Sequence, residues 1–447
     1  MLYKETLNLQ IMTRILTLLL LLFYFKCAIA SNEIYISKGQ NQLLPIAINN
    51  FEGNSVYSQK LLENVLELIR ADLKHSGFFK IVSPSSFIES ASGIDHKPHF
   101  ASWRQINANL LLNGQIIRNG SSTFTLKIIL WDIVAEKSII AEVFSGSVES
   151  WRKLAHQISD KIYELVTGDK GYFDTKIFYI SEINNGIKIN KKLAVMDYDG
   201  ANHQFLSDGK FLVLTPRLSP SAKVLLYVSY ETKSPKVYVK NLKTGRSVLL
   251  GNFSAMSFAP RFSPDGSKII FSLAKNGTTD IWVMDLATSK IKQLTSGLAI
   301  NTSPSYSRDS QKIYFNSDRS GSGQIYSISV SHQEIERLSF GEGVYSAPVC
   351  SPNGKYIAFT KNIRGQGFYI GVMRNDGSDE RIITSGYLVE GASWAPNSKI
   401  IAFAKTSKPS RGVPPVTKLY TIDISGQNER LISTPNEASD PEWSFGH

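Results

Sequence analysis

Short apolar runs, each followed by a turn, recur along the C-terminal two-thirds of the chain. Residues 259–297 show the pattern once: apolar and β-branched runs predict four strands, at Ala259–Ser263, Lys268–Leu273, Asp280–Leu286 and Ile291–Thr295. Between the first two lies Ser263-Pro264-Asp265-Gly266, which is typical of a type I turn. A four-stranded meander of this kind has an apolar face that it cannot cover by itself, so we expect similar units to pack against it.

The same pattern is repeated at a fixed period. The proline that follows the start of the first strand has counterparts 44 residues apart, at Pro216, Pro260, Pro304, Pro348 and Ala392. A fixed period of this length with four strands per repeat is typical of a β-propeller. The sequence therefore predicts an all-β propeller in the C-terminal part of the chain.

The two ends of the repeat region predict how many blades there are. Residues 440–444 match a first strand, whereas Lys176–Ile180, Leu193–Asp197 and Gln204–Ser207 match a second, third and fourth strand. We therefore expect the C-terminal strand, residues 440–445, to complete the first blade. This gives a six-bladed propeller over residues 171–447, whose closure also removes the open sheet edges.

Residues 31–170 show a different pattern, which predicts a smaller α/β domain before the propeller. One helix is expected at Val56–His75, with Gly77 as its cap, and another after Ser147. The apolar face of the second helix consists of Trp151, Leu154, Ile158, Ile162 and Leu165. A short helix is expected at Trp103–Asn109, and residues 168–171 read as a hinge-like linker.

These two long helices should cover a mixed sheet of about five strands. The strands are expected at Ile34–Ser37, Leu44–Ile48, Phe78–Val82, Leu110–Ile117, Thr123–Ile133 and Ile139–Phe144.

The first thirty residues predict an export signal. Lys4 and Arg14 precede an apolar run at Ile15–Phe25, and Ala28-Ile29-Ala30 offers a small-x-small cleavage site. We expect residues 1–30 to be removed, so that Ser31 becomes the new N-terminus. The apolar run is too short for a permanent membrane-spanning helix.

Charge and cysteine content agree with an exported protein. The formal net charge is +11, of which residues 1–30 contribute +2, so that +9 remains after cleavage. Lysines and arginines are scattered over turns rather than gathered in a stripe, and export also argues against a nucleic-acid partner. Cys350 alone would remain, because Cys27 lies in the signal, so no intramolecular disulfide is expected. This favours a bacterial periplasm, with Cys350 as a small apolar core residue.

Catalytic motifs are not found. No Gly-x-Ser-x-Gly string is present, and Gly391-Ala392-Ser393-Trp394-Ala395 is a first strand of the repeat. We therefore expect no enzyme activity, although a peptidase-type propeller stays as the least favoured alternative.

Metal and cofactor motifs are weak, so we expect no cofactor and no metal. His96 and His99 flank Pro98 in a loop without further ligands, which favours a solvated loop over a zinc site. Residues 197–200 hint at a calcium loop, but Asn202 stands where glycine is needed and Asp208 where glutamate is needed. We interpret these residues as a turn. A propeller that binds a small ligand or a metal ion in its channel remains an alternative.

Several segments together resemble one family. The segment Glu164–Ile177 is the most specific of them. The others are Ala71-Asp72-Leu73, Ser76–Phe79, Tyr198-Asp199-Gly200, Phe258–Gly266 and Asp280–Leu286. With these segments the chain resembles, from end to end, the TolB family of the Tol–Pal envelope system.

The resemblance implies a periplasmic adaptor that does not span a membrane. It implies binding of the lipoprotein Pal at one mouth of the propeller and of TolA through the N-terminal segment, in support of outer-membrane integrity and of invagination during cell division. It also implies that colicins exploit the protein, and it leaves room for other envelope partners.

The resemblance also assigns site residues. It places Pal contacts at Met256, Ala259, Thr302, Ser303 and Ala347, and TolA contacts within residues 31–42, including Glu33, Ile34, Tyr35 and Ile36. Many relatives carry histidine at the position of Met256, so we expect an apolar contact there instead of a polar one. Tight packing around a narrow axis is the other interpretation of the mouth residues, and an edge strand is the other interpretation of the N-terminal segment.

Overall fold

The computed structural model describes residues 43–445, apart from 54–55, 90–93, 95, 185–188 and 252. The predicted signal (residues 1–30), the predicted strand Ile34–Ser37 and the proposed TolA contacts Glu33 to Ile36 lie outside the described residues. Within the described part of the chain, no helix combines the length and the apolar character that crossing a membrane requires.

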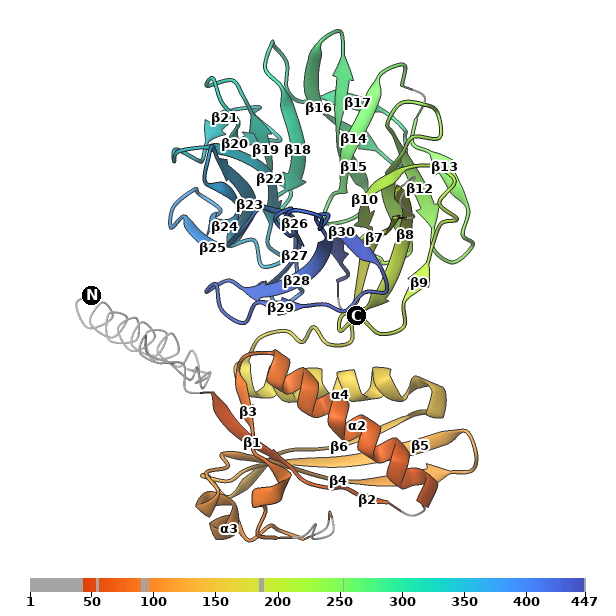
Figure 1. Ribbon diagram of the computed structural model, residues 1–447, viewed down its shortest axis with the longest axis vertical. Helices are drawn as coiled ribbons and strands as arrows, with labels where there is room; N and C mark the ends of the chain where they lie inside the picture. Colours follow the sequence, from red (N-terminus) through yellow and green to blue (C-terminus); the bar gives the residue numbers. More distant parts are fainter. Residues whose placement is uncertain are drawn as a thin grey trace, which may run out of the picture. The chain divides into compact units, whose positions relative to one another are not determined.

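The N-terminal domain consists of one sheet with helices on it (Figure 1). The sheet has the order β3-β1-β4-β5-β6, with β2 paired to β4. β1 runs parallel to β3 and β4, whereas β4, β5 and β6 are antiparallel. Its elements are β1 (Leu44–Ile48), β2 (Glu52–Gly53), α2 (Val56–His75), β3 (Phe79–Ile81), η1 (Pro84–Ser86), α3 (Phe100–Gln105), β4 (Leu110–Asn119), β5 (Thr123–Asp132), β6 (Lys137–Ser147), η2 (Val148–Ser150) and α4 (Trp151–Thr167).

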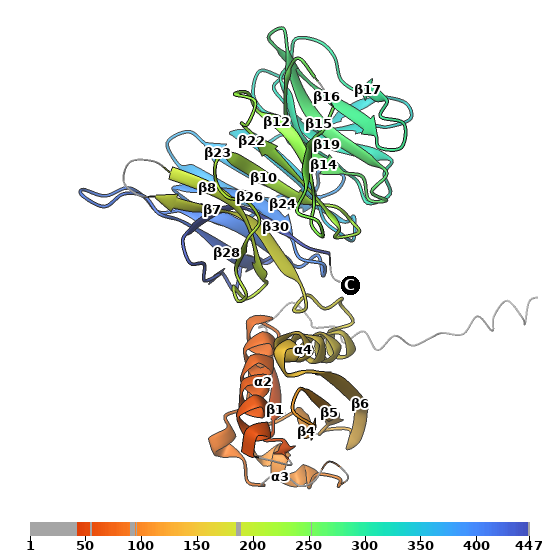
Figure 2. The ribbon, with the colours of Figure 1, turned by 90° about the vertical axis from the view of Figure 1, so that its right-hand side faces the viewer.

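Apolar side chains of β4 point alternately to the two faces of the sheet, which explains why both faces are covered. Leu110 and Leu112 share a core with residues of α2 and α4, whereas Leu111 packs with Trp103 of α3. Successive strand residues point to opposite faces, so each face needs its own apolar cover. Figure 2 shows α2 and α4 together on one side of the sheet.

Most predicted elements of this domain are confirmed, with two differences. The short helix is α3 at Phe100–Gln105, earlier than the predicted Trp103–Asn109, because Asn107 has φ +57° and ends the turn. Leu165, predicted on the apolar face of α4, is 43 % exposed. In the last turn of α4, Tyr163 and Val166 pack instead, because the aromatic residues after the helix offer them a surface.

The propeller contains six four-stranded sheets among the described residues, which confirms the predicted fold (Figure 1). Five blades are continuous in sequence. They are formed by β10 (Val213–Leu218), β11 (Val224–Ser229), β12 (Lys236–Asn241) and β13 (Ser247–Leu249); β14 (Met256–Phe262), β15 (Lys268–Lys275), β16 (Thr278–Asp285) and β17 (Ile291–Gln293); β18 (Asn301–Tyr306), β19 (Lys312–Ser317), β20 (Gln324–Ser329) and β21 (Ile335–Arg337); β22 (Val344–Cys350), β23 (Tyr356–Ile363), β24 (Gly367–Arg374) and β25 (Arg381–Gly386); and β26 (Leu388–Trp394), β27 (Ile400–Thr406), β28 (Thr417–Asp423) and β29 (Arg430–Leu431).

The sixth blade is closed by the end of the chain, as predicted. It has the order β30-β7-β8-β9, with β7 (Lys176–Asn184), β8 (Ile189–Asp197), β9 (Gln204–Phe205) and β30 (Glu437–Trp443). Glu442 pairs with Phe178, and Trp443 pairs with Ile177. The closing strand begins earlier than the predicted residue 440 and ends at Trp443 rather than at 445.

Neighbouring blades supply the burial that one blade lacks. Ile270 and Ile281 of one blade share a core with Tyr306, Ile313 and Phe315 of the next. The turn within the repeat also forms as predicted, since the Gly266 amide donates to the Ser263 carbonyl oxygen at 2.8 Å and Gly266 has φ +74°.

Each innermost strand contains a bulge that the sequence did not predict. In all six, the pairing register shifts around the residue just before the proline position, and that residue has a positive φ. These bulge residues are Thr215 (φ +48°), Ala259 (+49°), Ser303 (+54°), Ala347 (+49°), Gly391 (+71°) and Asp440 (+50°). Five are not glycine, so the ring of bulges is held against a local backbone preference.

Candidate functional site

An apolar ring marks the end of the channel at which the innermost strands begin; this end is called the mouth here. Four residues before each proline position, five of the six blades carry an apolar side chain, and the sixth carries Glu437. These mouth-ring residues are Leu212, Met256, Ile300, Val344 and Leu388. The first four are 40–49 % exposed, which is unusual for apolar side chains repeated at one place in a fold.

The five residues assigned to Pal contacts lie together next to this ring. They belong to the innermost strands of three consecutive blades, β14, β18 and β22. Met256 is a mouth-ring residue, whereas Ala259, Ser303 and Ala347 are bulge residues. Thr302 lies beside Ser303 and donates its hydroxyl to Asn316 Oδ1 at 2.9 Å. The small bulge residues are partly exposed, so they leave room for a partner at the mouth.

Two strongly exposed apolar residues near the mouth were missed. Leu298 is 93 % exposed and Phe340 is 73 % exposed, and they lie in the segments that lead into β18 and β22. The family resemblance did not indicate them, because it assigned partner contacts only to individual positions that match the family. The 44-residue period was the available signal for the mouth ring itself.

The opposite ends of the innermost strands line a channel cavity of about 510 Å³. The side chain just after each proline position reaches it; in strand order these are Arg217, Arg261, Ser305, Val349, Ser393 and Glu442. Glu442 Oε2 lies 3.6 Å from Arg217 Nη1 and 3.9 Å from Arg261 Nη1. Burial, together with the neighbouring Arg217, lowers the pKa of Arg261 to about 9.

Cys350 lines the same cavity, at a position where four of the five other blades have aromatic residues. As predicted, its thiol is free and it packs against the core of its blade, where it is partly buried. Burial raises the pKa of its thiol to about 11, so little reactive thiolate forms near neutral pH.

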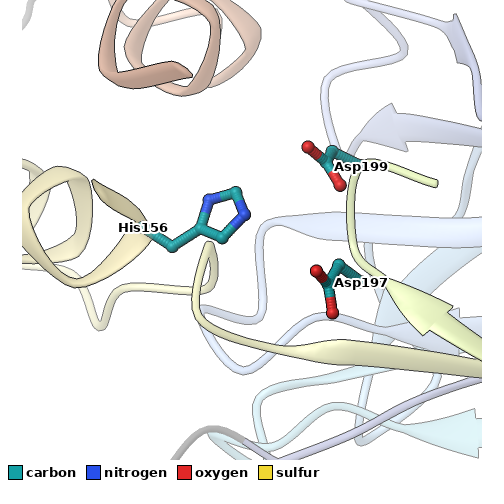
Figure 3. A group of neighbouring side chains, drawn as sticks. All are labelled: His156, Asp197 and Asp199. Carbon is teal, nitrogen blue, oxygen red and sulfur yellow. The ribbon is translucent and has the colours of Figure 1, made fainter. Parts of the chain in front are cut away.

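A polar group joins the N-terminal domain to the sixth blade, which contains β8 (Figure 3). His156 lies on α4, Asp197 ends β8, and Asp199 lies in the turn that follows. One ligand-type atom from each of the three lies within 4.8 Å of the others. In Figure 3 the imidazole of His156 faces the two carboxylates. The distances alone would suit a metal ion.

Cations of the chain itself already neutralise these carboxylates. Arg152 Nη2 contacts Asp199 Oδ2, and Lys176 Nζ lies 2.7 Å from Asp197 Oδ1. Since a metal ion would have to compete with both cations, we interpret the group as an ion-pair network across the domain junction. Asp197 and Asp199 thus belong to a turn, as predicted, but one with a structural partner on α4.

Asp72 extends this network into α2. Its carboxylate is buried and accepts from His156 Nδ1 at 2.8 Å and from the Tyr198 hydroxyl at 2.6 Å. Burial lowers the pKa of His156, but the hydrogen bond and charge of Asp72 outweigh burial, so the net shift is upward. Distant parts of the sequence meet here, and for that reason no local motif indicated the contact.

The segment between α4 and β7, which includes the predicted linker residues 168–171, is held on both sides rather than free as a hinge. The Asp160 carboxylate of α4 accepts from the backbone amides of Phe173 at 2.7 Å and Asp174 at 2.9 Å. Tyr172 packs edge-on against Trp443, whose indole Nε1 donates to Thr175 at 2.8 Å. The closing strand of the propeller is therefore packed directly on the linker.

His96 and His99 do not form a metal site within the described residues. Both are exposed, and His99 Nδ1 is hydrogen-bonded to the Ser102 hydroxyl at 2.8 Å. The two histidines belong to no group of three ligands among the residues that the structure describes.

Comparisons with known proteins match both domains. The TolB beta propeller domain matches residues 163–446, and the TolB amino-terminal domain matches residues 32–139. A Tol-Pal system protein TolB of Rickettsia peacockii (strain Rustic) is 49 % identical over 249 residues, which is 56 % of each chain. A protein of the same name from Rickettsia felis is 50 % identical over 243 residues, or 54 % of each chain. The chain thus spans about half the length of the curated relatives it matches.

A solved structure extends the match over nearly the whole chain. The crystal structure of TolB from Acinetobacter baumannii has a TM-score of 0.79 and 27 % identity, and the alignment covers 91 % of this chain and 97 % of that one. Both domain matches, the relatives and the fold agree, and the protein belongs to the TolB family.

Proposed function

We propose that this protein is a periplasmic adaptor of the Tol–Pal envelope complex that binds Pal at the mouth of its propeller. The observation that carries this proposal is the mouth ring, because exposed apolar side chains repeated around an opening provide a docking surface. The small bulge residues Ala259, Ser303 and Ala347, with Thr302 beside them, leave space for an inserted loop of the partner.

A matched pair of substitutions tests this docking surface. Ile300 is 49 % exposed in the mouth ring, whereas Ile335 is 39 % exposed on β21, the outermost strand of the same blade. We expect Ile300→Asp to weaken Pal binding by about tenfold or more, because a buried carboxylate would replace an apolar contact. Ile335→Asp should leave Pal binding unchanged. Calorimetry with purified Pal measures both, and equal affinity of the two variants would contradict the proposal.

Substitutions of the small residues test the insertion itself. Thr302→Trp and Ala259→Trp should abolish capture of Pal by filling the mouth, and circular dichroism checks that both variants remain folded. Capture at the wild-type level by folded variants would move the binding site elsewhere.

The second partner, TolA, is proposed to bind the N-terminal segment that includes Glu33, Ile34, Tyr35 and Ile36. We propose that Pal binding and release of this segment are coupled. Replacing Ile34 and Tyr35 by alanine should abolish TolA capture and leave Pal capture intact. Equal TolA affinity with and without Pal would refute the coupling.

We further propose that the segment at residues 1–30 directs export, and that the protein supports outer-membrane integrity and invagination during division without catalysing a reaction. Deletion of the gene should increase leakage of periplasmic proteins, and restoration by the wild type but not by Ile300→Asp would tie that role to the mouth.

A further inference from the structure

The channel cavity carries an excess of positive charge. Its lining includes Lys170, Arg217, Arg261 and Arg308, and Glu442 is the one carboxylate among the lining residues that the structure describes. Arg217 and Arg261 have side chains only 13 % and 18 % exposed. Two nearly buried guanidinium groups therefore share a single carboxylate, and guanidinium groups that are removed from water require compensation by anions.

The single carboxylate does not satisfy the two guanidinium groups. Its separations of 3.6 and 3.9 Å from the arginine nitrogens are too long for hydrogen bonds. Its other oxygen, Oε1, accepts from the Leu218 backbone amide at 3.3 Å, so it is partly engaged elsewhere. Arg217 Nη1 donates to the Pro216 carbonyl oxygen at 2.6 Å, but Glu442 still leaves donor capacity on both arginines.

Two other blades show what this position does elsewhere in the propeller. Ser305 accepts from the Cys350 amide at 3.2 Å, and Ser393 accepts from the Trp443 amide at 2.8 Å. Side chains at this position thus link a blade to the backbone of the next one. Arginine has no hydrogen-bond acceptor and cannot make this link. A contact between neighbouring blades therefore does not explain why Arg217 and Arg261 occupy this position.

We propose that the channel cavity binds a small oxyanion, of the carboxylate or phosphate class, between Arg217 and Arg261. Guanidinium groups bind planar carboxylates and phosphates through paired hydrogen bonds, and a cationic cavity shielded from bulk solvent strengthens such contacts. A volume of about 510 Å³ accommodates an anion of the size of citrate with accompanying water. This site lies beyond the bulges from the mouth and is independent of the proposed Pal contacts.

Calorimetry and thermal unfolding of the full exported chain test the site with citrate and with inorganic phosphate as probes. Sodium chloride at matched ionic strength is the reference, since it separates binding from general salt effects. We expect saturable heat and a rise in Tm for at least one probe, and the preferred probe distinguishes carboxylate from phosphate chemistry. No rise above the chloride reference for either probe would overturn the proposal.

Two substitutions with opposite expected effects on anion affinity make the test specific. Arg261→Gln should weaken binding by about tenfold or more, since it removes a charge-assisted pair. Glu442→Gln should strengthen binding several-fold, because it removes the competing carboxylate. A variant that is merely destabilised would not bind more tightly, so this increase separates binding from folding.

Arg246→Gln is the matched control, because Arg246 is an exposed arginine outside the cavity lining. It should retain wild-type affinity. If Arg246→Gln and Arg261→Gln weaken binding equally, the anion binds at the general surface and the cavity site is refuted. Should Arg261→Gln not fold, Arg261→Lys provides the same comparison with the charge retained but the paired hydrogen bonds removed.

Discussion

The two ends of each innermost strand differ in chemistry although only a few residues separate them. In β14, Met256 at the mouth is apolar and exposed, whereas Arg261 beyond the bulge is charged and largely buried. The bulge at Ala259 divides the two ends, and it recurs in every blade. Each innermost strand therefore contributes to the apolar mouth ring at one end and lines the channel cavity at the other.

The difference shows how a repeat fold separates stability from binding. Residues at the cavity end connect elements far apart in the chain, as Trp443 does when it packs on Tyr172 and bonds to Thr175. Residues of the mouth ring have much of their surface in water and few comparable connections. Substitutions at the two ends should therefore affect different measurements.

Trp443→Ala should produce the largest effect on stability. The side chain is 2 % exposed and joins the closing strand to the linker, so we expect a loss of about 3–5 kcal/mol in the free energy of unfolding. Ile300→Ala at the mouth should change it by less than about 0.5 kcal/mol. Urea denaturation followed by tryptophan fluorescence and circular dichroism measures both. Similar losses for the two variants would remove the distinction between the ends.

Substitutions at the bulge that separates the two ends should change the free energy of unfolding, because Ala259 has a left-handed conformation. Ala259→Val should lower the free energy of unfolding by about 1–2 kcal/mol, because a β-branched residue fits φ +49° poorly. Ala259→Gly should raise it by up to about 1 kcal/mol, because glycine adopts this conformation without strain. Chemical denaturation of the two variants is the measurement. A loss of stability in both would show that the methyl group of Ala259, rather than its backbone, matters at this position.

The blades were predictable because their cause is local and repeated. The apolar runs around Lys268–Leu273 and the turn at Ser263–Gly266 specify strands and their connection, and the 44-residue period specifies the neighbours. Closure followed from matching the strand around Trp443 to the incomplete blade that begins at Lys176. The two helices of the N-terminal domain were predictable for the same reason, since their apolar spacing is regular.

The bulges and the junction were not predictable, for two physical reasons. Ala259, Ser303 and Ala347 have positive φ although they are not glycine, so their conformation is imposed by the surrounding sheet rather than by residue type. The contact of Asp72 with Tyr198 joins residues far apart in sequence, and neither residue signals it alone. Prediction therefore succeeded where structure follows local propensity and failed where tertiary packing overrides it.

The junction between the N-terminal domain and the propeller should make the free energy of unfolding depend on pH, whereas the mouth ring should not. Burial and the neighbouring Arg430 lower the pKa of His75 to about 4, and Arg430 Nη1 lies 2.6 Å from its Nδ1. The folded protein therefore keeps His75 neutral, whereas the unfolded chain binds a proton near pH 6.5. The stabilising contribution is complete above pH 6.5 and is lost as the pH falls toward 4.

His75→Gln should remove this dependence, because the Gln side-chain oxygen still accepts from Arg430 but does not titrate. Between pH 7 and pH 5 the wild type should lose about 1 kcal/mol relative to the variant, after allowance for solvent screening of the half-buried ring. The raised pKa of His156 acts in the opposite direction, since its contribution is present below pH 6.5 and is lost as the pH rises through its folded value. That contribution cancels in the comparison, because both proteins contain His156. Parallel curves of unfolding free energy against pH would show that His75 is not held neutral at the junction.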